Sequence, residues 1–161
     1  MSMKRSLFIA LMMAFVLNVC AQEAKAPQME FAMQLRVTIG APYSCGETQH
    51  GERIVIPITG GTFEGPRLKG TVLSGGADYQ LANKALNRTE LEAIYCIKTD
   101  DGVTIHIRNR GIIADNYFKC APQFEAPADS KYAWLNNALF VCSPEWRQDF
   151  EGIILNVWQV K

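Results

Sequence analysis

The feature that most constrains the fold is an alternation of apolar and polar residues with a period of two. Phe31, Met33, Leu35, Val37 and Ile39 alternate with polar or small residues. This pattern is typical of a β-strand that buries one face. The alternation returns in Ile54–Ile58, Leu91–Ile97 and Val103–Ile107, and the Asp-Gly step before the last of these is a strong hairpin signal. The pattern therefore predicts an antiparallel β protein.

Further strands are predicted around Tyr117–Phe124, Trp134–Cys142 and Ile153–Val160, for a total of eight to ten strands about ten residues apart. Strands at this density form either a sandwich or a barrel. We favour a small closed barrel, because closure removes exposed strand edges and an eight-stranded barrel has room for side chains or one small ligand. We expect a single all-β domain over residues 29–161.

The N-terminus carries the three parts of a secretory signal peptide. Lys4 and Arg5 are followed by the apolar run Leu7–Leu17, and Val19 and Ala21 are small residues that predict cleavage before Gln22. The apolar run is shorter than the roughly 20 residues of a membrane-spanning helix, so we expect no transmembrane segment in the mature chain. Residues 1–21 are the predicted signal peptide and 22–28 a flexible leader of an exported, periplasmic or secreted protein. Lipid attachment at Cys20 is the alternative.

Charge and cysteine content restrict the partners. Without residues 1–21 the chain has 14 basic and 16 acidic residues, a net charge of −2, so no nucleic-acid partner is expected. Cys45, Cys96, Cys120 and Cys142 form no CxxC pair, which argues against a metal site. They are either disulfide-bonded or simply small buried side chains. Because the strands that carry Cys120 and Cys142 are consecutive, this pair is the candidate disulfide.

The segment Ile56–Gln80 holds six glycines in 25 residues. Glycine in β structure marks tight turns, bulges or places where another backbone or a ligand comes close. A phosphate-binding loop is not supported, because no lysine follows Gly70 and a strand rather than a helix comes next.

With this segment in view, the chain resembles the bacterial and fungal family called domain of unknown function 3237. The resemblance spans about residues 29–160, and besides the glycine-rich segment it rests on Gly46–Gly51, Thr99–Gly102, Arg108–Gly111, Tyr117-Phe118, Phe124-Glu125 and Tyr132–Asn136. It implies a calycin-like antiparallel barrel and brings no established reaction with it.

Polar residues on inward-facing positions are the candidates for ligand binding. Asn109 continues the apolar row of Val103–Ile107, Asp78 shares a strand face with Gln80, and Trp134 shares one with Asn136. Tyr95 and Trp134 would supply contact area. We expect Asp78, Asn109 and Trp134 to line one cavity. Alternatively, Asp78 and Asn136 only hold turns and Trp134 belongs to the core.

The candidates for acid/base catalysis are Glu64, Asp78 and Arg110. Glu64 lies between Phe63 and Gly65, and a carboxylate in an apolar pocket has a raised pKa and can donate a proton. Arg110 would stabilise negative charge. Exposure of Glu64 to solvent in a turn is the alternative.

Two functions follow. One is an exported module that binds a small, partly apolar molecule through Gln80, Tyr95, Asn109, Trp134 and Asn136. The other is a cofactor-free acid/base enzyme, such as an isomerase, cyclase or dehydratase. A desolvated carboxylate in the cavity would favour the enzyme, and neutral polar groups alone would favour binding. No motif calls for a cofactor, and neither the ligand nor the oligomeric state follows from the sequence.

Overall fold

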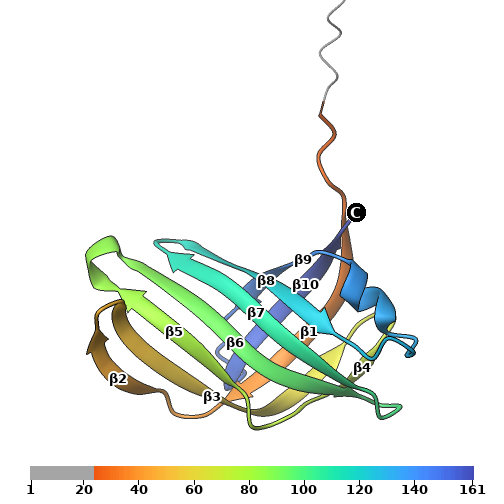
Figure 1. Cartoon of the computed structure of the whole chain (residues 1–161), viewed down its shortest axis with the longest axis horizontal. Helices are drawn as coiled ribbons and strands as arrows, with labels where there is room; N and C mark the ends of the chain where they lie inside the picture. The colour runs from red at the N-terminus through yellow and green to blue at the C-terminus, as the bar shows by residue number, and fades with distance from the viewer. Residues whose placement is uncertain (1–23) are drawn as a thin grey trace, which may run out of the picture.

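The computed structural model describes residues 24–161, which form ten strands and two short 3-10 helices (Figure 1). The elements are β1 (Met29–Ile39), β2 (Tyr43–Thr48), β3 (Gly51–Glu64), β4 (Lys69–Val72), β5 (Ala77–Asn83), η1 (Lys84–Leu86), β6 (Arg88–Thr99), β7 (Thr104–Ala114), β8 (Tyr117–Glu125), η2 (Ala133–Asn137), β9 (Phe140–Glu145) and β10 (Gly152–Val160). The predicted signal peptide and Cys20 lie outside the described residues.

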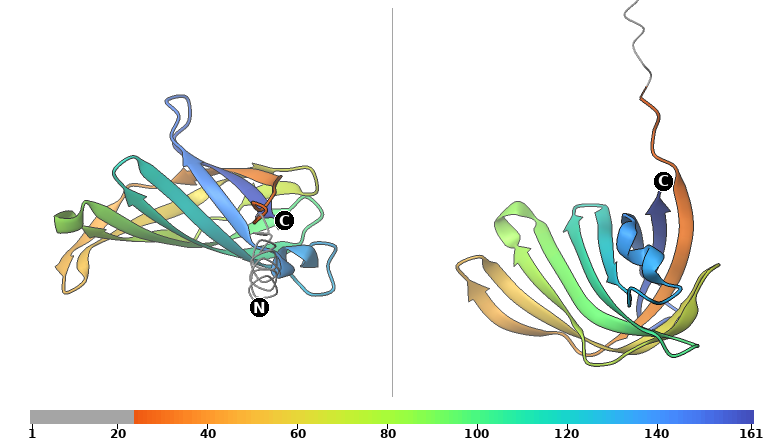
Figure 2. Two further views of the ribbon diagram at one scale, coloured as in Figure 1. Left: turned by 90° about the horizontal axis from the view of Figure 1, so that it is seen from above. Right: turned by 45° about the vertical axis from the view of Figure 1, so that its right-hand side comes forward.

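Eight strands close into an antiparallel barrel in the order β1-β10-β9-β8-β7-β6-β4-β3, and β3 pairs again with β1. The two additional strands extend this barrel: β2 pairs with β3, and β5 pairs with both β3 and β6. The views in Figure 2 show the sheet curving around the interior. The predicted all-β barrel is therefore confirmed. In the part of the chain that the structure describes, no helix is long and apolar enough to cross a membrane.

Two short strands, β4 and β5, fill the space between β3 and β6. The C-terminal part of β3 pairs with β4 and its N-terminal part pairs with β5. Leu73–Gly76 separates the two strands and is held on both sides, because Leu73 N–H donates to Cys96 O at 2.9 Å and Ile58 N–H donates to Gly76 O at 2.9 Å. β4 therefore completes the eight-stranded ring between β3 and β6, whereas Asp78 lies on β5.

The glycines of this segment allow the close approach of other chain segments. A Cβ atom on Gly61 would collide with the backbone carbonyl of Arg36 on β1, and Gly61 also has a positive φ of 134°. A Cβ atom on Gly76 would collide with Ile94 O and Tyr95 Cβ on β6. The glycine-rich segment therefore packs against β1 and β6.

The core follows the alternation read from the sequence. The inward side chains of β1, β6, β7 and β10 are buried, among them Met33, Leu35, Ile97, Ile105 and Val157, none more than 1% exposed. The predicted strand Trp134–Cys142 differs from the structure, since residues 133–137 form η2 and β9 begins only at Phe140. Asn136 explains the difference: its side chain accepts a hydrogen bond from Ala126 N–H (2.7 Å) and donates one to Ala126 O (2.9 Å), which ties η2 to the end of β8.

Candidate functional site

A cavity of about 60 Å³ lies inside the barrel. Its walls are side chains of β1, β3, β5, β6, β7, β8 and β10, and Trp146 from the β9–β10 loop stands at its edge. Most of this lining is apolar, including Val37, Ile58 and Leu155. The polar exceptions are Asp78, Gln80, Tyr95 and Asn109, so four of the residues singled out in the sequence do meet in one place.

The strand register explains why these residues meet. Ala93 of β6 pairs with Asp78 of β5 on one side and with Asn109 of β7 on the other. The inward neighbours of Ala93 on β6 are the larger Leu91 and Tyr95. The Ala93 methyl group leaves space between these two large side chains. Asp78 and Asn109 flank that space on either side. The position of Ala93 therefore determines where the cavity lies.

Asp78 is a carboxylate in a largely apolar environment. Gln80 Nε2 donates a hydrogen bond to its Oδ2 at 2.7 Å, whereas its Oδ1 is shielded from solvent and has no hydrogen-bond partner in the described protein. Burial raises the pKa of Asp78, and the hydrogen bond from Gln80 offsets part of this rise. An environment of this kind favours the protonated carboxylic acid.

Asn109 and Tyr95 complete the polar side of the cavity. Asn109 is 3% exposed and its Oδ1 has no hydrogen-bond partner in the described protein. Buried acceptors are normally paired, so an unpaired one on a residue that lines a cavity is a candidate acceptor for a ligand hydroxyl. The Tyr95 side chain is 4% exposed, and burial raises the pKa of its phenol. Tyr95 therefore stays neutral at any physiological pH.

Trp146 is the residue that the sequence reasoning missed. It lies in the β9–β10 loop, is 62% exposed, and yet contributes to the cavity lining. The loop is held by an ion pair between Arg147 and Asp149 (3.0 Å) and by Phe150, whose ring centroid lies 4.5 Å from the Arg36 guanidinium carbon. A tryptophan within the polar segment Glu145–Glu151 was the one available signal for it.

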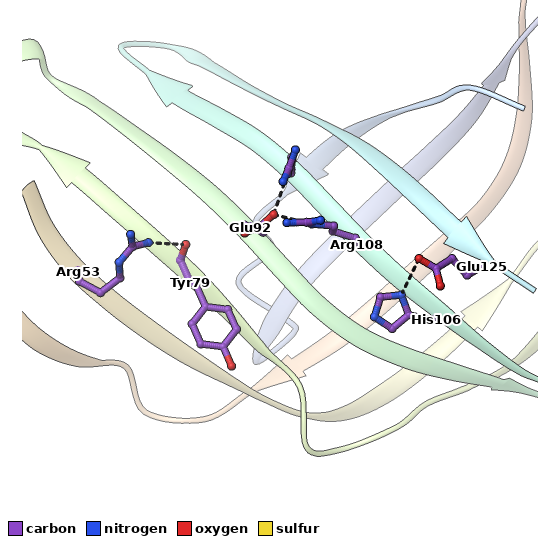
Figure 3. A network of polar contacts seen from close by, with 7 residues as sticks. Arg53, Tyr79, Glu92, His106, Arg108 and Glu125 are labelled. Carbon is purple, nitrogen blue, oxygen red and sulfur yellow. Dashed lines mark hydrogen bonds and ion pairs between the residues drawn. The ribbon is translucent and has the colours of Figure 1, made fainter. Parts of the chain in front are cut away.

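Glu64 and Arg110 lie away from the cavity. Glu64 ends β3 as an exposed residue, so the predicted apolar pocket around it is not found. Arg110 points outward from β7, and its Nε donates to Glu92 Oε1 at 2.7 Å, which also accepts from Arg108 Nε at 2.6 Å. Figure 3 shows Glu92 and Arg108 of this network. Arg110 is therefore not placed to stabilise charge beside Asp78.

Trp134 and Asn136 are also separated from the cavity, contrary to the prediction. The Trp134 ring packs 5.9 Å from the ring of Phe140, and the guanidinium carbon of Arg67 lies 3.8 Å from the Trp134 ring centroid. Asn136 is occupied with the backbone of Ala126. Both residues belong to η2, whose conformation moves them off the strand face on which they were expected.

A second, larger hollow of about 870 Å³ runs across the outer face of β5–β9. Its charged groups already have partners, since Arg88 binds Glu90 at 3.1 Å, Lys119 donates to Ser143 Oγ at 2.9 Å and Arg53 reaches Tyr79 O at 3.4 Å (Figure 3). The hollow is open to solvent and has none of the unpaired buried oxygens seen inside. The interior cavity is therefore the better candidate site.

The described part of the chain contains neither a disulfide nor a cluster of metal-ligating side chains. Cys120 lines the cavity and pairs in register with Cys142, and all four described cysteines are free thiols, so no disulfide is found among residues 24–161. Over the same residues, no group of three or more His, Cys, Asp or Glu side chains is arranged to hold a metal ion.

These features define a class: antiparallel β-barrel proteins with a small interior cavity and a half-buried carboxyl group in its lining. The chain belongs to the family described as "Protein of unknown function (DUF3237)", whose model matches residues 27–116 and 113–160.

The relatives of this chain have the same fold over nearly their whole length. A UPF0311 protein of Rhodopseudomonas palustris is 32% identical over 151 residues, covering 83% of this chain and 96% of that protein. The crystal structure of a conserved R. palustris protein of unknown function matches with a TM-score of 0.77 at 32% identity, over 86% of this chain and 100% of that one.

One relative has a named activity. A hydroalkoxylation enzyme of Penicillium herquei is 26% identical over 155 residues, covering 96% of this chain and 97% of that protein. A crystal structure of an enzyme from the same organism has a TM-score of 0.72 at 26% identity, over 87% of this chain and 98% of that one.

Proposed function

We propose that this protein is a cofactor-free acid/base enzyme of the isomerase, cyclase or dehydratase type, with Asp78 as the proton carrier. The observation that carries the proposal is the Asp78 carboxyl group, which lines an apolar cavity and whose solvent-shielded Oδ1 has no hydrogen-bond partner in the described protein. A carboxylic acid kept neutral by its surroundings can donate a proton at neutral pH, as general acids in apolar sites do.

The hydrogen bond from Gln80 makes the two carboxyl oxygens of Asp78 inequivalent. Because Oδ2 already accepts from Gln80, the proton of the neutral acid resides on Oδ1, the oxygen without a partner in the described protein. On the opposite side of Ala93, Asn109 Oδ1 can accept a hydrogen bond from a substrate hydroxyl. The two backbones are separated by two strand spacings, about 10 Å, so one small group between the side chains can contact both.

An addition of a hydroxyl group across a carbon–carbon double bond fits this arrangement. Asp78 Oδ1–H protonates one carbon, the substrate oxygen bonds to the other, and the hydroxyl proton returns to the Asp78 carboxylate. The protein ends as it began and no electrons are exchanged. Hydroalkoxylation is this class of reaction, and the similarity to the Penicillium herquei enzyme over almost the whole chain supports the proposal.

The size of the cavity limits what can react in it. A volume of about 60 Å³ accepts a group of about two or three heavy atoms. The remainder of the substrate would then lie at the mouth, against the exposed ring of Trp146. We therefore expect a partly apolar substrate whose small unsaturated end enters the barrel.

The alternative is a binding module that uses the same cavity without chemistry. It is favoured by the neutral groups of Gln80, Tyr95 and Asn109, which suffice to orient a ligand. Asp78→Asn separates the two functions, because the amide keeps the shape and polarity of the side chain and cannot transfer the proton.

The test begins with mass spectrometry of small molecules that co-purify with the protein. These molecules and the probe 2-allylphenol are then incubated with the protein in D₂O. We expect a product of cyclisation or isomerisation that has gained one non-exchangeable deuterium, and a rate at least about 100-fold lower for Asp78→Asn. The exposed Asp129→Asn is the matched control and should react like the wild type. Retention of an unchanged ligand by wild type and Asp78→Asn alike would support the binding module instead.

A further inference from the structure

The contact between β8 and β9 is the least regular part of the barrel wall. β7 and β8 are in register from His106 to Ala114, and β9 and β10 from Phe140 to Glu145. Between β8 and β9, in contrast, the described part of the chain has one pair of residues in antiparallel register, Cys120 with Cys142. The connection between these strands is also long and contains η2. The two cysteines therefore form the registered pair at this seam, beside the packing of Phe124 on Phe140 and the hydrogen bond from Lys119 to Ser143.

The geometry of the pair suits a covalent bond. Both side chains face the interior, with Cys120 5% and Cys142 1% exposed. Directly opposed residues in antiparallel strands have Cα atoms about 4.5–5.5 Å apart, which lies inside the range that disulfides span. The neighbouring Cys120 thiol, together with burial, raises the pKa of Cys142.

We propose that Cys120 and Cys142 form a reversible cross-strand disulfide that fastens β8 to β9. The oxidant is a small-molecule disulfide such as oxidised glutathione. The Cys120 thiolate attacks it and displaces one glutathione thiol, and Cys142, after loss of its proton, attacks the mixed disulfide and displaces the second. Two protein thiols are thereby oxidised and one glutathione disulfide is reduced to two thiols. The exchange takes place before the barrel has closed, because the cavity beside Cys120 is too small to admit glutathione.

The bond would hold the seam and would constrain the unfolded chain. It closes a loop from Cys120 to Cys142 that includes η2, and cross-links over loops of this length typically stabilise small domains substantially. For a domain of this size we expect oxidation to raise the melting temperature by about 10 °C.

The experiment uses the protein refolded from denaturant in a buffer of reduced and oxidised glutathione. Remaining thiols are blocked with N-ethylmaleimide, and the protein is digested with trypsin without reduction. Cleavage after Lys119, Lys131 and Arg147 places the two cysteines on the peptides Cys120–Lys131 and Tyr132–Arg147. We expect these two peptides to be joined in the folded fraction and to separate on treatment with dithiothreitol.

The double variant Cys45→Ser/Cys96→Ser is the matched control. Cys45 is exposed and Cys96 lies on the outward-facing side of β6, so the variant should keep both the linked peptides and the rise in melting temperature. Cys142→Ser should lose both. Maleimide on Cys120 and Cys142 in the folded fraction, or pairing with Cys45 or Cys96 equally often, would overturn the proposal. Maleimide labelling and peptide pairing are measured on the wild-type protein, so the test stands even if Cys142→Ser does not fold.

Discussion

Replacement of Asp78 by asparagine is expected to stabilise the protein at the same time as it removes the proton carrier. In the wild type, an ionised Asp78 would place a negative charge in a half-buried, largely apolar site with Oδ1 unpaired, and an unpaired charged group costs more than the about 1–3 kcal/mol of a neutral one. Asparagine keeps the hydrogen bond from Gln80 and leaves a neutral amide group in the place of the unpaired charge. We therefore expect Asp78→Asn to raise the free energy of unfolding by about 1–3 kcal/mol at pH 8.

The sign of the pH dependence follows from the direction of the pKa change. The folded-state pKa of Asp78 is raised above its ordinary value of 3.8, so the folded state holds the proton more tightly than the unfolded state does. The contribution of this group to stability is thus fully present below pH 3.8 and is lost as the pH rises through the folded-state pKa. The advantage of Asp78→Asn should be near zero at pH 4 and should grow to its full size at higher pH.

Urea unfolding followed by tryptophan fluorescence, from pH 4 to pH 8, measures this difference. Asp129→Asn, an exposed site, serves as the control and should not reproduce the trend. An Asp78→Asn protein that is less stable than the wild type at pH 8, or a difference that does not change with pH, would refute the reasoning. Asp78 would in that case be an ordinary solvated carboxylate.

Three further predictions concern the cavity, η2 and the N-terminus. Ala93→Leu should fill the roughly 60 Å³ cavity and reduce ligand retention or turnover at least tenfold, measured by co-purified ligand, with Asp78 unchanged. Asn136→Ala should lower the free energy of unfolding by about 1–2 kcal/mol in a urea titration and leave turnover per folded molecule unaltered, because it removes both hydrogen bonds to Ala126. Intact-mass analysis of the exported protein should give a chain that begins at Gln22; a mass that retains residues 1–21 would contradict export by cleavage, and a diacylated Cys20 would indicate lipid anchoring.

The alternation of side chains predicted the fold and part of the cavity, because one periodicity controls both. The row that buries Ile105 and Ile107 also buries Asn109. Asp78 and Gln80 share a strand face as predicted, and the structure shows that this face lines the cavity, a direction that the alternation alone leaves open. The same rule could have excluded Arg110, since a residue that follows an inward Asn109 must point outward.

Other features depended on contacts that a sequence pattern does not encode. Trp134 and Asn136 sit at alternating positions, but the bonds between Asn136 and Ala126 place them in a 3-10 turn. Trp146 joins the cavity from a loop, where no periodicity applies. The role of Ala93 required the register of three strands, which the sequence does not specify.

The separation of β4 from β5 has a consequence for how this protein can diverge. β4 completes the eight-stranded ring, while Asp78 and Gln80 lie on β5, which is positioned by β3 and β6 alone. Substitutions and small length changes in β5 or in its turn at η1 can therefore accumulate without opening the ring. A family built on this plan can alter the chemistry of its pocket while retaining its scaffold.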